Sequence, residues 1–431
     1  MPISYLVADV DEIAARLELY RVEDEIQSEV SIASKVYSTQ NFSSFTDLVQ
    51  SFLEEEVSGE DFPTVACCSM TGPVADGFCI IPNLCWKMSE EEMALDLGID
   101  RVVFINDFIA SGYGLLIVPD EDLILLNKDA TVCLDSIDPK CIIGAGNGLS
   151  EAVLTHDGTE FNIYPGEGGF SDFAPRTSEE FGLLTHIKSR LRIDSVSVQR
   201  IVSNHGIESI YWYLVYSSPE LANDQVSEEI RQLDGDGGLL ICKYAKFEPV
   251  DFICHKAILL FLSAFGAEVG NVACRSLPKG GIFITGEITP KILEILLESD
   301  TFMANYCLKG RMRPYLEEIP IFVVTTPSIG ILGARVRARR CLRDQGIFSH
   351  SPGSDGEDTK ETSPEQEAFP LRSQPSKPPP ARVKFERNEL RDRSPSSVWI
   401  SSAWKYLAVG VCITAGLTAS AFCAGRRSSP R

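Results

Sequence analysis

The segment LVADVDEIAARLELY, residues 6–20, determines how the chain begins to fold. It starts as an apolar β-strand through Asp9 and continues, without a glycine, through the carboxylates of Asp11 and Glu12. Taken alone, residues 11–19 favour a helix, because acidic residues lead and Ala, Arg, Leu and Glu have high helix propensity. A strand followed by a hairpin is the other interpretation, and the rest of the chain is needed to choose between them.

Apolar runs like this first one recur along the chain. They are rich in β-forming residues and lie at residues 3–10, 64–70, 101–107, 141–146, 280–286 and 319–326. Amphipathic helical patterns separate some of them, at residues 45–56 and 249–274. This alternation predicts an α/β fold with buried sheets. A chain of 431 residues that is 44% hydrophobic can bury a large core, so we expect two domains and a tail.

Charge and cysteine content exclude several classes of function. The net charge is −22, which would repel the phosphates of a nucleic acid. Thirteen cysteines are scattered without a Cys-x-x-Cys pair, and the five histidines do not fall in HxxxH or HxH spacing. We therefore predict reduced thiols in a cytosol-facing protein, with no metal site and no nucleic-acid partner. The opening MPISYLVADV lacks a basic segment and indicates a strand, not a secretory signal.

The composition changes after the last α/β pattern. Residues 347–397 are rich in Ser, Pro and charge, which predicts a disordered linker. Within residues 398–425, the 19 residues from Tyr406 to Ala424 are uncharged and lie between Lys405 and Arg426, a run long enough to cross a bilayer as a helix. We expect this segment to anchor the protein in a membrane, followed by a short basic tail at 426–431. A weakly apolar tail outside any membrane is the alternative.

Asn106 and Asp107 stand where the strand RVVFIN meets the helical pattern that follows it. A carboxylate at the edge of a sheet, beside an amide that can bind a hydroxyl, suits a general base that takes a proton from an alcohol. The competing interpretation is structural, since Asp at this position is often only a helix N-cap.

Two glycine-rich segments could hold a phosphate or a sugar. IIGAGNGLSEAVL, residues 142–154, predicts a hairpin whose turn directs backbone N–H groups at a phosphate, although an ordinary hairpin would look the same. YPGEGGFSDFAP, residues 164–175, places Glu167 among glycines that let a polar ligand approach the backbone. Residues 280–290 and 325–338 add two strand-to-helix turns with glycines, where α/β proteins bind nucleotides.

In this order, the motifs resemble the bacterial-type glucokinase family of the actin-like sugar kinases, from about Tyr5 to Arg340. The resemblance rests on VADV…ARL, MTGPV…NLCW, INDFIAS, GAGNGL, PGEGGFSDFAP, GGIFITG and the final GILGA. It implies two actin-like (ribonuclease H-like) α/β domains with a central cleft, the smaller at 1–110 and the larger at 111–346. It also implies transfer of the γ-phosphoryl group of ATP, with Mg²⁺, to the 6-hydroxyl of glucose, and it allows a homodimer.

The resemblance assigns roles to individual residues. Asp107 resembles the general base that accepts the proton of the 6-hydroxyl. The residues similar to sugar ligands are Asn106, Asp107, Glu167 and Gln199. The residues similar to the nucleotide site are Asp9, Gly146, Asn147, Gly148, Gly286 and Gly333, of which Gly146-Asn147-Gly148 would form the second phosphate turn.

The chain departs from the family most clearly in the first phosphate turn. The family pattern Asp-x-Gly-Gly-Thr-Asn-x-Arg reads Asp-Val-Asp-Glu-Ile-Ala-Ala-Arg at residues 9–16, so both glycines, the threonine and the asparagine are replaced. Asp11 and Glu12 would face a triphosphate. A like-charge pair about 4 Å apart costs about 1 kcal/mol in water and about 4 kcal/mol at an effective dielectric constant near 20. Smaller departures are Ser150, Phe170, Gln199 and Glu287, where the family has Gly, His, Glu and Gly.

Three functional interpretations follow. The first is a membrane-tethered glucokinase relative that still binds hexose but phosphorylates it weakly or not at all. The second is a working glucokinase in which Asp11 and Glu12 turn aside or bind Mg²⁺. The third is a scaffold that has lost both ligands. In all three, the register of the motifs favours a hairpin, with Leu17 and Leu19 on one face of its second strand.

Overall fold

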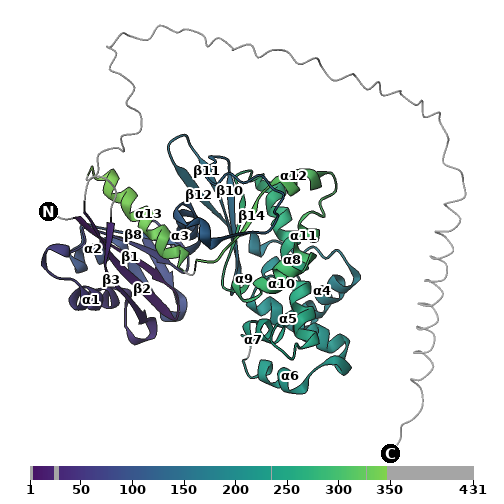
Figure 1. Cartoon of the computed structure of the whole chain (residues 1–431). Helices are drawn as coiled ribbons and strands as arrows, with labels where there is room; N and C mark the ends of the chain where they lie inside the picture. Colours follow the sequence, from purple (N-terminus) through teal and green to yellow (C-terminus); the bar gives the residue numbers. More distant parts are fainter. Residues whose placement is uncertain (1–2, 24–28, 234, 327, 347–431) are drawn as a thin grey trace, which may run out of the picture. The chain divides into compact units, whose positions relative to one another are not determined.

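The computed structural model describes residues 3–23, 29–233, 235–326 and 328–346. The predicted linker at 347–397, membrane anchor at 398–425 and basic tail at 426–431 lie outside these residues. The described part contains two large β-sheets, each with helices packed on it (Figure 1).

The first sheet has five strands in the order β3-β2-β1-β4-β8. The strands are β1 (Ile3–Val10), β2 (Ala14–Val22), β3 (Glu29–Ser38), β4 (Val65–Met70) and β8 (Arg101–Asn106). The first three are antiparallel, whereas β1, β4 and β8 are parallel. The carboxyl ends of these three parallel strands therefore meet at one edge of the sheet.

The opening segment forms the β1–β2 hairpin, in which Asp9 pairs with Arg16. Helix propensity is overridden because β2 is hydrogen-bonded to β1 on one side and β3 on the other. The alternation along β2 also buries Leu17 and Leu19 completely. The predicted hairpin, with both leucines on one face, is confirmed.

Helices cover both faces of the first sheet. One face packs against α1 (Phe45–Glu56), α2 (Glu90–Leu97) and a small sheet of β5 (Val74–Ala75), β6 (Phe78–Ile81) and β7 (Trp86–Ser89). Helix α1 starts at Ser44, whose side chain accepts from the N–H of Asp47, and it buries Phe45, Leu48 and Phe52. The opposite face packs against α13 (Ile329–Asp344) and α3 (Asp107–Gly114).

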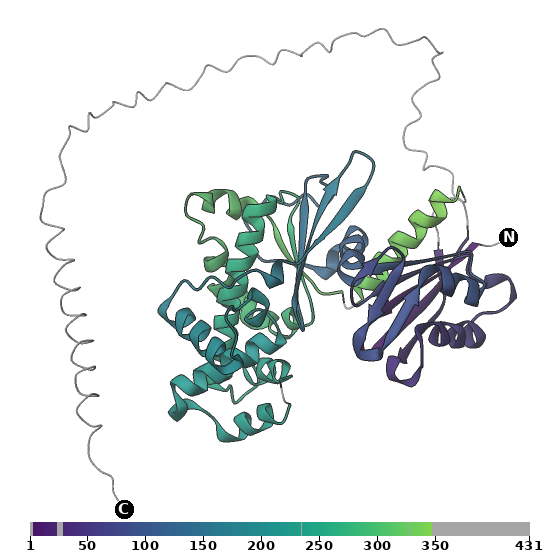
Figure 2. The same cartoon turned by 180° about the vertical axis from the view of Figure 1, so that it is seen from behind.

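The second sheet has six strands in the order β12-β11-β10-β13-β14-β9. The strands are β9 (Leu123–Leu125), β10 (Lys140–Ala145), β11 (Leu149–His156), β12 (Phe161–Gly166), β13 (Ile282–Thr285) and β14 (Ile321–Val324). The helices are α4 (Ser178–Leu191), α5 (Asn204–Ser217), α6 (Asp224–Arg231), α7 (Gly238–Tyr244), α8 (Phe252–Ser276), α9 (Ile288–Lys291), α10 (Leu293–Glu298), α11 (Thr301–Tyr306) and α12 (Arg313–Glu318). These helices gather on one side of the sheet in both views, and α8 runs through their core (Figures 1 and 2).

Helix α13 belongs with the first sheet although it ends the described chain. Its apolar face, which includes Ile331, Ala338 and Leu342, packs on Val7 of β1 and Ile105 of β8. The division into domains at 1–110 and 111–346 remains a prediction, but this last helix packs on the sheet formed by the first range. Sequence order does not reveal such a return, because it depends on contacts between residues more than 200 positions apart.

One described helix is long and apolar enough to span a membrane. It is α8, but 72% of its most apolar stretch is buried inside the protein. The described cysteines are free thiols, and most of them are buried, as their use as small apolar core residues predicts.

Candidate active site

Asn106 resolves the question of which residue caps helix α3. Its Oδ1 accepts hydrogen bonds from the backbone N–H groups of Phe108 (3.0 Å) and Ile109 (3.3 Å), so it is the N-cap. Its Nδ2 donates to the carbonyl oxygen of Gly72 at 3.2 Å, which fixes the amide plane. The helix therefore does not need Asp107 as its cap, and the purely structural interpretation of Asp107 loses its basis.

The Asp107 carboxylate lies at the carboxyl edge of the first sheet. Its Oδ1 accepts from the N–H of Phe108 at 2.8 Å, and its Oδ2 accepts from Oγ1 of Thr71 at 3.3 Å. Burial raises the pKa of Asp107, and these hydrogen bonds offset part of that rise. A partly desolvated carboxylate with an elevated pKa has the properties of a general base.

Asp9 lies at the same edge, near the end of β1. Its Oδ1 accepts from Oγ of Ser69 at 2.7 Å. Burial raises the pKa of Asp9 to about 6; the carboxylates of Asp107 and Asp11 add to the rise, while Ser69 and Arg16 oppose it. Several carboxylates therefore lie close together at this edge, and their mutual repulsion disfavours the state in which all of them are ionised.

The first turn, residues 11–13 between β1 and β2, is closed by its own side chain. Oδ1 of Asp11 accepts from the backbone N–H groups of Ile13 and Ala14, both at 2.7 Å. Glu12 turns to another partner, because its Oε2 accepts from Nδ2 of Asn83 at 2.7 Å. Two N–H groups at the position that the resemblance gives to ATP phosphate are therefore already bound to a carboxylate of the chain.

The second turn, Gly146–Gly148 between β10 and β11, is closed by main-chain atoms. The N–H of Gly146 donates to the carbonyl oxygen of Gly148 at 2.9 Å, and its own carbonyl accepts from the N–H of Asn204, at the start of α5, at 2.8 Å. Asn147 at the tip is exposed. The predicted glycine hairpin is confirmed, and no carboxylate within the turn occupies its backbone.

A carboxylate nevertheless stands beside this second turn. Gly286, at the end of β13, has φ +94° and approaches so closely that a methyl group there would overlap the carbonyl oxygen of Ala145. The next residue is Glu287, which is exposed; its Oε1 lies 4.0 Å from where a methyl group on Gly146 would be. Gly286 thus packs on the end of β10, next to the second turn, and its assignment to the nucleotide site remains a prediction.

The PGEGG segment is pressed against β11, which explains its glycines. A methyl group on Gly169 would overlap the carbonyl oxygen of Leu149, and one on Gly168 would overlap the carboxylate of Glu151. Glu167 itself is exposed at the start of the short 3₁₀ turn that the glycines form. Its exposed carboxylate is therefore accessible to a ligand.

Gln199 is brought to the second turn by a pairing between distant segments. The N–H of Val198 donates to the carbonyl oxygen of Ser171 at 2.8 Å, which ties the Gln199 region to the exit of the PGEGG segment. Oε1 of Gln199 lies 3.1 Å from where a methyl group on Gly148 would be. The structure therefore places Gln199 between the expected sugar loop and the second phosphate turn.

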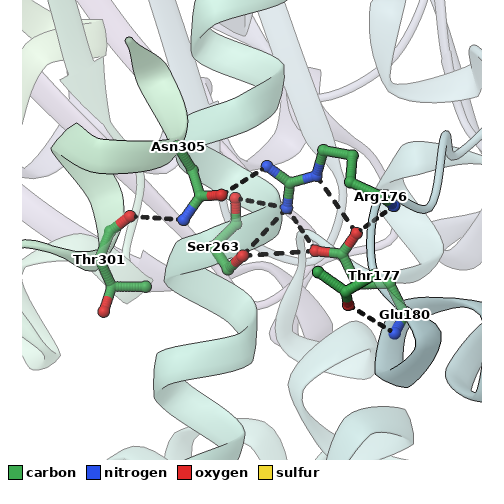
Figure 3. A network of polar contacts seen from close by, with 6 residues as sticks. All are labelled: Arg176, Thr177, Glu180, Ser263, Thr301 and Asn305. Carbon is green, nitrogen blue, oxygen red and sulfur yellow. Dashed lines mark hydrogen bonds and ion pairs between the residues drawn. The ribbon is translucent and has the colours of Figure 1, made fainter. Parts of the chain in front are cut away.

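Arg176 anchors the chain just after this loop, a role that the motifs did not predict. Its guanidinium group pairs with Glu180 of α4, donates to Oδ1 of Asn305 at 2.8 Å and to the carbonyl oxygen of Ser263 at 3.0 Å (Figure 3). Glu180 is only 2% exposed. The pattern Thr177-x-x-Glu180 fits a helix capping box and would have marked the start of α4, but not the partners on α8 and α11.

Gly333 has a packing role. A methyl group there would overlap the carbonyl oxygen of Ala110, so this glycine lets α13 cross α3 closely. At the start of α13, a methyl group on Gly330 would lie 2.6 Å from the carboxylate of Asp9. This helix contact accounts for Gly333 without a nucleotide, and its assignment to the nucleotide site remains a prediction.

The predicted site residues form two groups. At the carboxyl edge of the first sheet lie Asp9, Asn106 and Asp107. Around the β10–β11 hairpin lie Gly146, Asn147, Gly148, Glu167, Gln199 and Gly286. Gly333 lies in the contact between α3 and α13, against Ala110 one turn after Asp107.

Known proteins with this sequence pattern identify the family. The family model described as Glucokinase matches residues 6–341. The glucokinase of Trichormus variabilis is 36% identical over 348 residues, which cover 78% of this chain and 98% of that protein. The glucokinase of Nostoc punctiforme is 34% identical over 346 residues, with 78% and 98% coverage. The chain belongs to the glucokinase family.

Solved structures agree with this fold. A glucokinase from an Antarctic psychrotroph aligns with a TM-score of 0.65 and 23% identity, over 78% of this chain and 99% of that one. A Balamuthia mandrillaris glucokinase in complex with glucose aligns with a TM-score of 0.64 and 22% identity, over 78% and 94%. The α/β architecture of this glucokinase-family chain is therefore that of the actin-like sugar kinases, and the resemblance in its motifs is confirmed.

Proposed function

We propose that this glucokinase-family protein binds glucose or a related hexose but phosphorylates it weakly or not at all, because its first phosphate turn is occupied by its own Asp11. The observation that carries the proposal is the pair of 2.7 Å hydrogen bonds from Ile13 and Ala14 to the Asp11 carboxylate. Family membership supports hexose phosphorylation as the ancestral reaction, and the intact Asp107 supports a retained sugar site.

Hexose binding requires hydroxyl ligands held in place. Asn106 is held through both ends of its amide, and the Asp107 carboxylate lies next to it in sequence with an elevated pKa. Glu167 is exposed on a loop fixed by glycines. The Balamuthia mandrillaris relative with this fold holds glucose, which supports the same ligand here. Phe170 is 67% exposed where the family has a histidine, so we expect one hydrogen bond to the sugar to be missing.

The reaction asks little covalent chemistry of the protein. Asp107 would accept the proton of the attacking hydroxyl, while the remaining groups position the substrates and stabilise charge. The family implies ATP with Mg²⁺ as the phosphoryl donor. The second turn fits a phosphate, since its backbone carries glycines and no carboxylate within the turn binds it. The first turn does not fit, because a carboxylate already accepts its N–H groups.

The energetic penalty at the first turn has two parts. A phosphate oxygen would have to displace Asp11 from Ile13 and Ala14, and the displaced carboxylate would then remain near the phosphate. Repulsion of that kind is worth about 1 to 4 kcal/mol, depending on how much water remains between the charges. Since about 1.4 kcal/mol is a factor of ten in affinity, ATP binding would fall by roughly tenfold to a thousandfold.

A working glucokinase is the second candidate, and Glu12 favours it. Its carboxylate is bound to Asn83 and so is already turned aside, as that interpretation requires. Only Asp11 would then need to move, which is a change of one exposed side chain.

Activity measurements separate these candidates. Glucose 6-phosphate formation by the full chain is followed with millimolar Mg-ATP, for the natural sequence and for the quadruple variant Asp11→Gly, Glu12→Gly, Ile13→Thr and Ala14→Asn. We expect turnover well below about 1 per second for the natural chain, the low end of enzymes generally, and an increase in the variant. Natural turnover at or above that rate, abolished by Asp107→Ala, would contradict the proposal.

We also propose that residues 398–425 tether the protein to a membrane with its body in the cytosol. The support is the uncharged run between Lys405 and Arg426. Deleting residues 398–431 should move the protein from the membrane fraction to the soluble fraction of a cell extract. If the truncated chain stayed in the membrane fraction, the assignment of residues 398–425 as a membrane anchor would be wrong.

A further inference from the structure

A pocket of about 460 Å³ lies among α4, α5 and α6, lined by residues that play no part in the candidate active site. Its lining residues are His186, Arg190, Glu208, Trp212, Arg231 and Gly235. This volume falls within the range of small-molecule sites, about 300 to 1,000 Å³.

Two arginines share one aromatic ring in this pocket. The guanidinium carbon of Arg190 lies 6.0 Å from the Trp212 ring centroid, and that of Arg231 lies 5.3 Å from it. A guanidinium group that packs on an aromatic face can still donate in-plane N–H groups to a carboxylate or phosphate. Arg231 also pairs with Glu228 one turn earlier on α6, but both side chains are exposed, so an incoming anion can compete with this pair.

Glu208 is the acidic residue of the pocket, and its carboxylate is already hydrogen-bonded to neighbouring groups. Oε1 of Glu208 accepts from Nε1 of Trp212 at 2.9 Å, and Oε2 accepts from the N–H of Gly237 at 2.9 Å. Glu208 is only 6% exposed, so it orients the Trp212 indole and offers little surface to a ligand. The accessible charge of the lining is therefore carried by Arg190 and Arg231.

His186 supplies an unsatisfied polar atom. Its Nε2 is buried and, among the described residues, has no hydrogen-bond partner. The ring packs on Tyr213 and Tyr216, with centroid distances of 5.7 and 5.2 Å. Burial and the Arg190 charge lower the pKa of His186, so the neutral imidazole adds no positive charge to the lining at pH 7.

We propose that this pocket binds a small phosphorylated metabolite, such as a hexose phosphate. Two guanidinium forks match the oxygens of a phosphomonoester better than they match a single carboxylate, and they place local positive charge on a chain with a net charge of −22. The volume of about 460 Å³ admits a sugar attached to the phosphate. The inference does not depend on whether the protein phosphorylates hexose.

The test uses Trp212 as a local reporter in the full chain. Substituting Trp86, Trp399 and Trp404 by Phe leaves Trp212 as the single tryptophan of the four in the sequence. Glucose 6-phosphate, inorganic phosphate and glucose are then titrated while the indole fluorescence is recorded. Calorimetry on the natural sequence gives the affinity independently of the reporter. We expect a saturable change with glucose 6-phosphate, much weaker binding of inorganic phosphate and no change with glucose.

Variants locate the binding. Arg190→Gln and Arg231→Gln should each weaken glucose 6-phosphate by about tenfold, since each removes a charged hydrogen bond. Arg190→Lys keeps the charge but loses the fork and should weaken binding severalfold. The matched control is Arg311→Gln, an exposed arginine outside the pocket, which should leave the affinity unchanged. Thermal melting of each variant confirms that it is folded.

Three results would overturn the proposal. If no phosphate compound gave a saturable fluorescence change, the pocket would not be a binding site for phosphorylated metabolites. Unchanged affinity in the double variant Arg190→Gln and Arg231→Gln would mean that the metabolite binds elsewhere, the active site included. Equal affinity for inorganic phosphate and glucose 6-phosphate would show that the pocket holds phosphate alone and does not recognise a metabolite.

Discussion

The first and second turns join strands at comparable places in the two sheets, yet they satisfy their backbones in different ways. In the first turn, Asp11 bonds the N–H groups of Ile13 and Ala14 with its own carboxylate. In the second turn, Gly146 bonds the carbonyl of Gly148, and the carboxylate of Glu287 stands outside. A hairpin turn at this place can therefore be closed either by a carboxylate of its own chain, as at Asp11, or by a main-chain hydrogen bond between glycines, as at Gly146 and Gly148.

The difference shows how a phosphate turn can change its function without unfolding. Backbone N–H groups need an acceptor, whether it is a ligand, water or a side chain. A carboxylate two or three residues away meets this need at no loss of structure, as Asx turns do elsewhere. The fold therefore gives little resistance to such a substitution, while the affinity for a second anion falls.

Breaking the second turn should have the largest effect. Gly286→Ala introduces a methyl group that overlaps the carbonyl of Ala145 at a φ of +94°. We expect a loss of about 3 kcal/mol in the free energy of unfolding, measured with urea, because strain and overlap combine. Gly148→Ala is the control: its methyl group would meet only the flexible end of Gln199, at 3.1 Å, and should cost less than about 1 kcal/mol. Equal losses would show that the close approach at Gly286 is unimportant.

Opening the first turn should raise nucleotide affinity. Asp11→Asn keeps an oxygen for the backbone but removes the charge, and we expect Mg-ATP to bind about tenfold more tightly by calorimetry. Asp157 makes a matched control, since its Oδ1 accepts from the N–H groups of Thr159 (2.8 Å) and Glu160 (3.0 Å) in another hairpin turn. Asp157→Asn should leave ATP affinity unchanged. No gain with Asp11→Asn would mean that another departure weakens the site.

The pH dependence of stability should distinguish buried from exposed carboxylates. Because the pKa of Asp9 rises from about 4 when unfolded to about 6 when folded, its contribution is present below pH 4 and is lost as the pH rises through 6. The loss at pH 7 is on the order of 3 kcal/mol. Asp9→Asn should remove this loss in urea titrations between pH 4 and 7.

The sign reverses at Asp157. Backbone hydrogen bonds from Glu160 and Thr159 lower the pKa of Asp157 to about 2. Its contribution is therefore present above its unfolded pKa and is lost as the pH falls through 2. Asp157→Asn should therefore lower stability above the unfolded pKa and have no such effect below pH 2. The same pH profile for Asp9→Asn and the natural chain would show that Asp9 does not titrate as described.

Clearing the second turn should have the smallest effect. Glu287→Gly restores the residue of the family and removes a carboxylate near Gly146. Since Glu287 is exposed, water screens its charge, and we expect only about a threefold gain in Mg-ATP affinity. If Glu287→Gly raised the affinity for Mg-ATP more than Asp11→Asn does, the second turn and not the first would be the main obstacle to ATP binding.

The sequence was informative where a pattern is local. The glycines of GAGNGL predicted a hairpin, which is present. The glycines of PGEGG predicted access for a ligand; in the structure Gly168 and Gly169 pack on β11, and the ligand site at Glu167 remains a prediction. Local propensity misled at residues 11–19, because pairing with two neighbouring strands outweighs helix preference.

Other features depend on side-chain rotamers and distant partners. The return of Asp11 to its own turn and the transfer of the helix cap from Asp107 to Asn106 are choices between nearly equivalent acceptors. The Arg176 anchor joins three helices that are far apart in the chain. Such contacts have no local pattern, so they emerge only with the folded structure.

The return of α13 to the first sheet has a consequence for synthesis on the ribosome. Strands β1, β4 and β8 are complete by residue 106, but α13, the longer of the two helices that pack on one of their faces, begins at Ile329. At about 5 to 20 residues per second, that face waits roughly 10 to 45 s for its cover. A nascent chain of this protein therefore exposes apolar surface on these strands while its second sheet is translated, and a chaperone would bind it during that interval.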